Sequence, residues 1–309
     1  MSTRPHHAVV ALAGGVGGAR LVDGLNRALP DGALQVVVNT GDDFAHWGLH
    51  ISPDLDTIMY TLGGLSPEER GWGIADDTFQ ALEEARRRGQ DDWFQLGDRD
   101  LVTHLARSHA LARGESLTEV TAALCRQLDV SRPILPMSDD PRPTMVVTKQ
   151  GEELAFQEWL VRARGVPKVA GIRFGGSGAA TPQVLDTLAA ADLVVICPSN
   201  PFVSIDPILA LGGVRDALVE TPVVAVSPIL NGKAVKGPLG SMIPELRGRA
   251  ASAEAVADHY RGLLDGYAVH VGDAFDAPFP VLETNILIQA REDRVTFART
   301  LLEFAGSLG

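Results

Sequence analysis

AVVALAGGVGGAR, residues 8–20, passes from an apolar run directly into a glycine-rich segment. The run at 8–12 predicts a buried β-strand, and the pattern over 17–29 predicts the α-helix that follows it. Residues 34–38 predict a second strand, so the chain opens with a strand, a helix and a strand. Strands that are apolar on both faces are typical of a parallel sheet covered by helices on each side.

Later segments resemble this opening. Residues 193–197 and 223–226 are apolar runs that we expect to return to the same sheet, and a helix over 182–191, with Thr181 as its N-cap, precedes the first of them. The pattern over 292–304 predicts an amphipathic helix that packs on the core. The fold class predicted is α/β: a Rossmann-like three-layer α/β/α arrangement with a mainly parallel sheet.

The middle of the chain has a different pattern. Helical patterns cover residues 78–88, 98–113 and 117–129. Residues 144–149 and 154–160 predict a hairpin around Gly151, and residues 168–173 predict one further strand. Ser116 and Glu119 have the spacing of a capping box before the third helix. We therefore expect a Rossmann-like nucleotide-binding core of residues 1–71 and 165–309, interrupted by a mainly helical insertion subdomain of residues 72–164.

Composition excludes several classes of protein. The 309 residues are 45% hydrophobic, enough for a large core, and the net charge of −12 includes no long acidic or basic block. We expect no nucleic-acid or membrane partner. Cys125 and Cys197 lack the spacing of a zinc ribbon, residues 1–7 do not resemble a signal peptide, and no apolar run could span a membrane. We expect a cytoplasmic protein, with a homodimer as the reasonable assembly.

The glycine segment, with Gly14, Gly15, Gly17 and Gly18, follows the first strand and opens the first helix. Backbone amides at a helix N-terminus attract anions, and the lack of a Cβ lets a phosphate approach closely. The segment lacks the Lys-Ser/Thr of a Walker A loop and the third glycine of the dinucleotide fingerprint. We expect phosphate binding here; the alternative is a tight turn between strand and helix.

Acidic residues follow the second strand. Asp42 and Asp43 lie at the edge of the sheet where open α/β folds bind ligands, and they repel each other unless a cation or a donor lies between them. Asp54 and Asp56 lie in the first turn of a predicted helix, where stabilising the helix dipole would also explain them. Mg²⁺ commonly binds one or two carboxylates together with phosphate oxygens, so Asp43 and Asp56 are its candidate ligands.

Polar groups also follow the two later strands. Ser199 and Asn200 offer hydrogen-bonding side chains, although a Ser-Asn-Pro sequence also forms a turn without any ligand. Lys233 and Lys236 stand alone in a glycine-rich loop, which favours an anion-facing role for at least one of them. Four loops thus bring glycine amides, carboxylates, hydroxyls and lysines to one predicted edge.

Together, six segments resemble the 2-phospho-L-lactate transferase family of coenzyme F420 biosynthesis: GGVGGAR (14–20), NTGDD (39–43), GLHISPDLDT (48–57), GDRD (97–100), CPSNP (197–201) and GKAVKGP (232–238). The resemblance spans most of the chain, and the long segment 48–57 is highly specific, whereas the glycine loop alone would not be. It implies that the terminal hydroxyl of the deazaflavin alcohol Fo attacks the phosphorus that carries a small acid, and that GMP departs from a guanosine diphosphate ester.

The resemblance also assigns roles to residues. The glycine loop, Ser199, Asn200 and Lys233 would hold the guanosine diphosphate part, and Asp43 and Asp56 would hold Mg²⁺. Asp42 or Asp43 could accept the proton of the attacking hydroxyl, and this role stays open because a metal-bound carboxylate is a poor base. Independently of the resemblance, Trp47 and Trp72 lie near the acidic segment and before the insertion, where they could stack on a planar ring, although core packing is the more frequent role of such residues. With His50 and Arg99, they are the candidate contacts of the deazaflavin; Arg99 could instead belong to a helix cap. The acid could be lactyl, enolpyruvyl or glyceryl.

Two other functions remain as alternatives. One is a non-catalytic relative of the same fold that binds a uridine diphosphate sugar and regulates metabolism, although such proteins lack the full Asp-rich segment. The other is a nicotinamide-dependent dehydrogenase, which the opening strand–helix–strand unit would fit and the missing third glycine disfavours.

Overall fold

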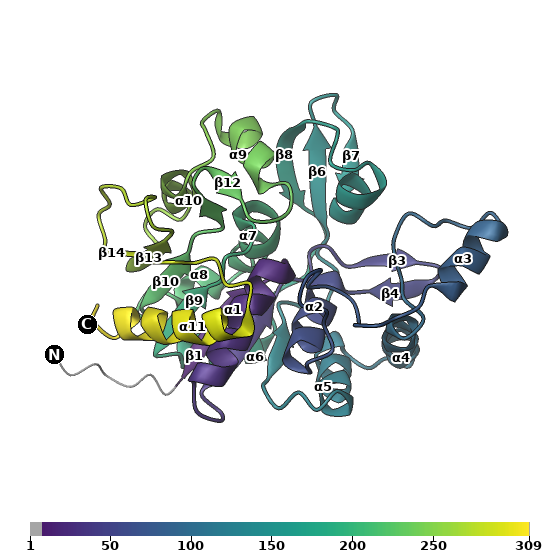
Figure 1. Cartoon of the computed structure of the whole chain (residues 1–309). Coiled ribbons are helices and arrows are strands. Elements are labelled where there is room, and N and C mark those ends of the chain that lie inside the picture. Colours follow the sequence, from purple (N-terminus) through teal and green to yellow (C-terminus); the bar gives the residue numbers. More distant parts are fainter. Residues whose placement is uncertain (1–7, 309) are drawn as a thin grey trace.

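A seven-stranded parallel sheet forms the centre of the computed structural model, which describes residues 8–308 (Figure 1). The strand order is β14 (Val281–Glu283), β13 (Gly266–Val269), β10 (Val223–Val226), β9 (Leu193–Ile196), β1 (Val9–Ala13), β2 (Leu34–Val38) and β5 (Ile134–Pro136). Each neighbouring pair is parallel. The four predicted sheet strands are all present, with bounds that differ by at most one residue at each end.

Helices cover both faces of this sheet, which confirms the three-layer α/β/α fold. Alternate residues of β1 separate into two cores: Val9 and Ala11 belong to one, and Val10 and Leu12 to the other. The helices on the first face are α1 (Gly15–Ala28), α2 (Pro53–Leu62), α5 (Leu117–Gln127) and α11 (Arg291–Ala305). Those on the second face are α6 (Pro182–Ala189), α7 (Asp206–Leu209), α8 (Val214–Ala217), α9 (Leu239–Arg247) and α10 (Ala253–His259).

The predicted helix termini are largely confirmed. The Thr181 hydroxyl accepts a hydrogen bond from the amide of Val184, and Ser116 and Glu119 form a capping box at the start of α5. The C-terminal helix α11 packs along α1, where a Cβ on Gly24 would collide with the carbonyl of Arg294 (Figure 1). These contacts fix α1, and with it the glycine segment at its N-terminus.

A second group of elements projects beside the sheet (Figure 1). It includes the hairpin β3 (Phe44–His46) and β4 (Leu49–Ile51), the helices α3 (Gln80–Arg87) and α4 (Asp100–Ala112), and a three-stranded sheet of β7 (Glu153–Ala155), β6 (Thr144–Thr148) and β8 (Val169–Phe174). Shorter elements complete the chain: η1 (Glu158–Arg162), η2 (Pro201–Ile205), β11 (Ile229–Leu230) and β12 (Lys233–Ala234).

One predicted strand is wrong beyond its first residues. The hairpin partner expected at 154–160 ends at Ala155, and η1 follows it as a π-helix. Phe156 and Trp159, three residues apart, are both buried, and a helical turn places both on one face whereas a strand would place them on opposite faces.

The division into core and insertion stays a prediction, and two pairings cross its boundaries. Strand β5 lies within residues 72–164 but pairs with β2 in the central sheet. Strand β6 pairs with β8, which lies beyond residue 165. Within residues 8–308, no helix is both long and apolar enough to cross a membrane. The expectation about residues 1–7 falls outside the described residues.

Candidate active site

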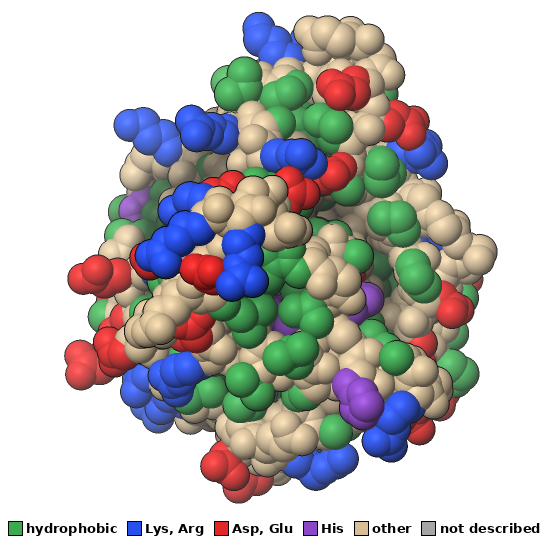
Figure 2. Space-filling view, turned by 90° about the vertical axis from the view of Figure 1, so that its right-hand side faces the viewer, with side chains coloured by type: hydrophobic (Ala, Val, Ile, Leu, Met, Phe, Trp, Pro, Cys, Tyr) green, Lys and Arg blue, Asp and Glu red, His purple; other side chains and the backbone are tan. Residues whose placement is uncertain are grey.

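A cavity of about 500 Å³ opens where β1, β2, β9 and β10 end. Its lining comes from the loops after these strands, from α2 and α4, and from η1. Open α/β sheets bind ligands at the carboxyl ends of their strands, so this is the position that the sequence predicts. Figure 2 shows the side of the molecule that carries α3 and α4, where acidic and basic side chains are interspersed around a hollow.

The glycine segment is held against the loop that follows β9. The Ser199 hydroxyl donates to the Gly14 carbonyl at 2.8 Å and accepts from the Gly14 amide at 3.1 Å. A Cβ on Gly18 would lie 2.7 Å from the Ser199 hydroxyl oxygen, and one on Gly17 would collide with the carbonyl of Pro198. These two glycines are therefore required by packing, and Ser199 orders the loop through its hydroxyl.

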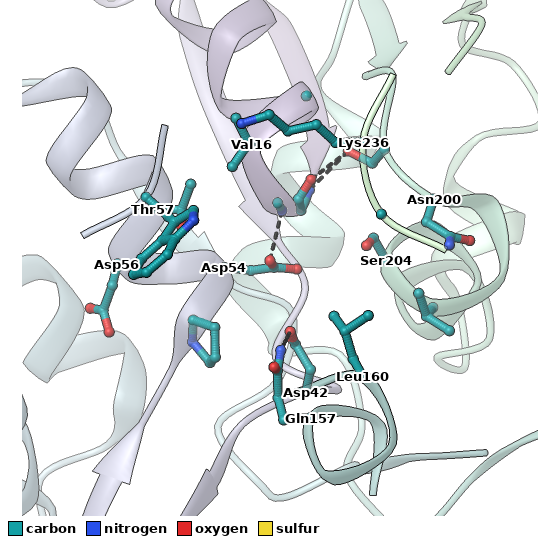
Figure 3. A pocket seen from close by; sticks show the side chains of 18 of the residues that line it. Val16, Asp42, Asp54, Asp56, Thr57, Gln157, Leu160, Asn200, Ser204 and Lys236 are labelled. Carbon is teal, nitrogen blue, oxygen red and sulfur yellow. Dashed lines mark hydrogen bonds between the residues drawn. The ribbon is translucent and has the colours of Figure 1, made fainter. Parts of the chain in front are cut away.

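The first amide of α1 faces a carboxylate. The Gly15 amide donates to Asp54 Oδ1 at 2.6 Å (Figure 3). Asn39 Nδ2 donates to Asp54 Oδ2 and to Asp42 Oδ1, both at 2.9 Å, so one amide group bridges two carboxylates. Burial raises the pKa of Asp54 to about 6, although the hydrogen bonds from Asn39 and Gly15 act in the opposite direction.

Asp42 and Asp43 have different surroundings. Asp42 lines the cavity, and its Oδ2 accepts a 2.7 Å hydrogen bond from Gln157 Nε2 (Figure 3). Burial, and then the nearby charges of Asp54 and Asp43, raise the pKa of Asp42 well above its usual value. Burial also raises the pKa of Asp43, whose Oδ1 has no hydrogen-bond partner among the described residues.

The other oxygen of Asp43 is occupied by neighbouring side chains. Asp43 Oδ2 accepts from the Ser52 hydroxyl at 2.7 Å and lies 3.0 Å from His50 Nε2. Ser52 directly precedes α2, but its hydroxyl makes no capping hydrogen bond and donates to Asp43 instead. His50, a candidate deazaflavin contact, thus contacts Asp43.

Asp56 is paired with an arginine. Both of its carboxylate oxygens accept hydrogen bonds from Arg107, a fully buried residue of α4. Burial alone would lower the pKa of Arg107, but Asp56 and, less strongly, Asp43 raise it above the usual value. The assignment of Asp43 and Asp56 to Mg²⁺ stays a prediction, and the structure shows that Arg107 already balances the charge of Asp56.

Among residues 8–308, two cations line the cavity, and neither is Lys233, which is exposed on β12. Lys236 extends over the glycine loop toward Val16 (Figure 3). Its Nζ donates to the Arg70 carbonyl at 2.7 Å. Burial, followed by the charge of Arg20, lowers the pKa of Lys236. Arg20 is itself buried in the cavity wall. Of the two lysines that the sequence singles out, Lys236 reaches the cavity.

The remaining predicted residues are divided between the cavity and other contacts. Asn200 lines the cavity, and its Oδ1 accepts from the amide of Phe202 at 3.0 Å. Trp72 also lines it. Trp47 donates instead to the Asp91 carbonyl, and Arg99 to the Ala75 carbonyl, and neither lines the cavity.

Comparison with known proteins identifies the family of this chain. The family model described as 2-phospho-L-lactate transferase CofD matches residues 9–275. Proteins named phosphoenolpyruvate transferase are similar to the chain: that of Streptomyces avermitilis is 47% identical, with 86% of each chain covered, and that of Nocardia farcinica is 40% identical, with 96% of this chain and 95% of the relative covered.

A crystal structure of a UPF0052 family member from Bacillus halodurans has the same fold. It aligns with a TM-score of 0.65 and 16% identity, and the match covers 96% of this chain and 98% of that one. The extent of the family match and the identity to the curated relatives settle the family. The chain belongs to the 2-phospho-L-lactate transferase CofD family and is a transferase.

Proposed function

We propose that this protein transfers a phosphoenolpyruvyl group from a guanosine diphosphate ester to Fo, with release of GMP, in the biosynthesis of coenzyme F420. One observation carries the proposal: the glycine loop, two cations and a pair of buried carboxylates surround a single cavity in a chain of this family. The curated relatives named phosphoenolpyruvate transferase support the enolpyruvyl form over the 2-phospho-L-lactate form.

In the proposed complex, the diphosphate lies against the N-terminus of α1. The helix dipole and the backbone amides after Gly14 attract its oxygens, and Lys236 and Arg20 supply positive charge from two other sides of the cavity. Phosphoryl transfer depends chiefly on in-line positioning and on neutralising the charge that develops on the transferred group. These residues can provide both.

The acidic residues offer carboxylate oxygens to a magnesium ion, although the described residues contain no preassembled group of three or more His, Cys, Asp or Glu side chains that could hold one. Asp42 and Asp54 share the amide of Asn39, line the cavity and have raised pKa values, so their ionised forms lack a compensating charge. Carboxylate oxygens are suitable ligands for Mg²⁺, and Asp42 and Asp54 therefore join Asp43 and Asp56 as candidates to hold it. When bound, Mg²⁺ would neutralise negative charge on the phosphate oxygens.

A carboxylate near the attacking hydroxyl would accept its proton. Asp42 lines the cavity, whereas Asp43 does not, and Asp43 Oδ1, which has no hydrogen-bond partner among the described residues, is buried and would have to become accessible to act. Burial raises the pKa of both groups, so each carboxylate, when ionised, is a stronger base than an exposed aspartate.

The test is GMP release by the purified chain with enolpyruvyl, lactyl and glyceryl guanosine diphosphate esters, each with and without Fo and with Mg²⁺ or EDTA. The proposal predicts GMP formation that requires both Fo and Mg²⁺ and is fastest with the enolpyruvyl donor. No GMP from any donor, combined with thermal stabilisation by a UDP-sugar, would instead favour the non-catalytic regulator.

A further inference from the structure

One end of the cavity lies away from the glycine loop, between α2 and α4. Tyr60 of α2, His104 of α4 and Phe94 from the segment before α4 all line it. None of these three residues has a role in the proposed binding of phosphate. Together they combine aromatic surface with a buried polar side chain.

His104 is held in one orientation by charged neighbours. Its side chain is 2% exposed, and its Nδ1 lies 3.3 Å from Arg107 Nη1. A guanidinium nitrogen can only donate, so Nδ1 accepts this hydrogen bond and the ring carries its proton on Nε2. The bidentate pairing of Arg107 with Asp56 fixes the guanidinium, and so fixes which histidine nitrogen is protonated.

The protonated nitrogen has no hydrogen-bond partner within the described part of the chain, although a carboxylate lies close to it. His104 Nε2 lies 3.2 Å from Asp100 Oδ1 but makes no hydrogen bond to it, and the Tyr60 hydroxyl donates to that same oxygen at 2.6 Å. A buried N–H without a well-aligned acceptor is costly, and a ligand oxygen that reached Nε2 from the cavity would remove this cost.

The surroundings define the kind of ligand. Phe94 belongs to an aromatic cluster in which its ring centroid lies 4.8 Å from that of Phe44 and 5.7 Å from that of Trp93. Ile51 and Pro53 add apolar surface to the same wall. A flat heteroaromatic ring with a carbonyl or similar oxygen at its edge would pack against this surface and accept the hydrogen bond of His104.

We propose that His104 is a specificity-determining residue, which recognises an edge oxygen of the acceptor's ring system through its Nε2–H. This inference rests on the proposed function, because it assigns the end of the cavity next to α4 to the acceptor and the end next to the glycine loop to the donor. It makes His104 a contact of the acceptor only.

Three substitutions of His104 distinguish a hydrogen bond to the acceptor from a purely structural role of this side chain. H104L removes the donor, H104Q returns an N–H close to the position of Nε2, and H104N places its nitrogen closer to the position of Nδ1. For each variant, Kd for Fo would be measured by calorimetry without donor, and KM for Fo and for the enolpyruvyl donor by GMP release, with the melting temperature as a check on folding.

H104L and H104N should raise Kd and KM for Fo by about 10- to 100-fold, the effect of losing one buried hydrogen bond. H104Q should recover most of this loss, and KM for the donor should stay within about twofold in all three. Equal Fo affinity in H104Q and H104N, or an unchanged KM for Fo in H104L, would overturn the inference. A wild-type protein that binds Fo but releases no GMP would instead contradict the proposed function.

Discussion

The Asp54 carboxylate accepts a 2.6 Å hydrogen bond from the amide of Gly15, the first residue of α1. A phosphate bound at a helix N-terminus uses amides of this kind. In the structure, the carboxylate thus occupies a position suited to an anionic ligand. A bound diphosphate would either displace Asp54 or share a cation with it.

Asp54→Asn should change how stability depends on pH. Burial raises the pKa of Asp54 to about 6, above the value of about 3.9 for an unfolded chain. Protonation therefore stabilises the fold below the unfolded pKa, and this contribution is lost as the pH rises through about 6. The variant should show a smaller decrease in the free energy of unfolding between about pH 4 and about pH 6, measured by urea denaturation.

Asp276→Asn, at an exposed carboxylate, is the matched control and should keep the wild-type dependence on pH. An Asp54→Asn variant with the same slope as the wild type over this range would show that Asp54 titrates normally in the folded chain.

Gly17→Ala should abolish most of the activity, because the new Cβ would collide with the carbonyl of Pro198 and displace the glycine loop. A displacement of about 1 Å at a reacting group can reduce turnover about 100-fold. Gly212→Ala is the control: residue 212 is exposed, and its added Cβ meets no atom within 4 Å. Steady-state rates for both variants test this prediction, and a Gly17→Ala enzyme with wild-type kcat/KM would refute it.

Lys236→Met and Lys233→Met should differ in their effect on the donor. Lys236 lines the cavity beside Arg20, and Lys233 is exposed outside it. Losing one charge-assisted contact to phosphate should raise KM for the donor about 10- to 100-fold in Lys236→Met, with a change below about twofold in Lys233→Met. The opposite ranking of the two variants would restore Lys233 as the residue that faces the donor.

Arg107→Met should destabilise the fold by about 3–5 kcal/mol, because it leaves the Asp56 carboxylate buried without its partner. The double variant Arg107→Met/Asp56→Leu should recover part of this loss, since no buried charge then remains unpaired. Urea denaturation of both single variants and the double variant measures the coupling. Additive losses would show that the pair does not act as a unit.

The sheet and the glycine loop could be predicted because their signals are local. The apolar runs of β2 and β10 agree with the structure at both ends, and the capping box before α5 needs only four residues to be recognised. The helical region at 158–162 was mistaken for a strand because the burial of Phe156 and Trp159 depends on tertiary packing.

The partners of the acidic residues could not be predicted in the same way. Asp56 pairs with Arg107 across 51 positions of sequence, and Asp42 with Gln157 across 115. No spacing rule links such residues, so a metal-binding role for Asp56 and an ion pair with Arg107 were indistinguishable in the sequence. Asn39 belongs to the segment NTGDD (39–43), where an asparagine is typical of a turn. Its role as the bridge between Asp42 and Asp54 is visible only in the structure.

Mass spectrometry of the deazaflavin product tests the proposed transfer most directly. The purified chain would be incubated with Fo, Mg²⁺ and an equimolar mixture of the enolpyruvyl and lactyl guanosine diphosphate esters. We expect Fo to gain a phosphoenolpyruvyl group through a phosphodiester, in a yield that matches the GMP released. Unmodified Fo after complete incubation, or a product that carries the guanosine part of the donor, would contradict the proposed transfer.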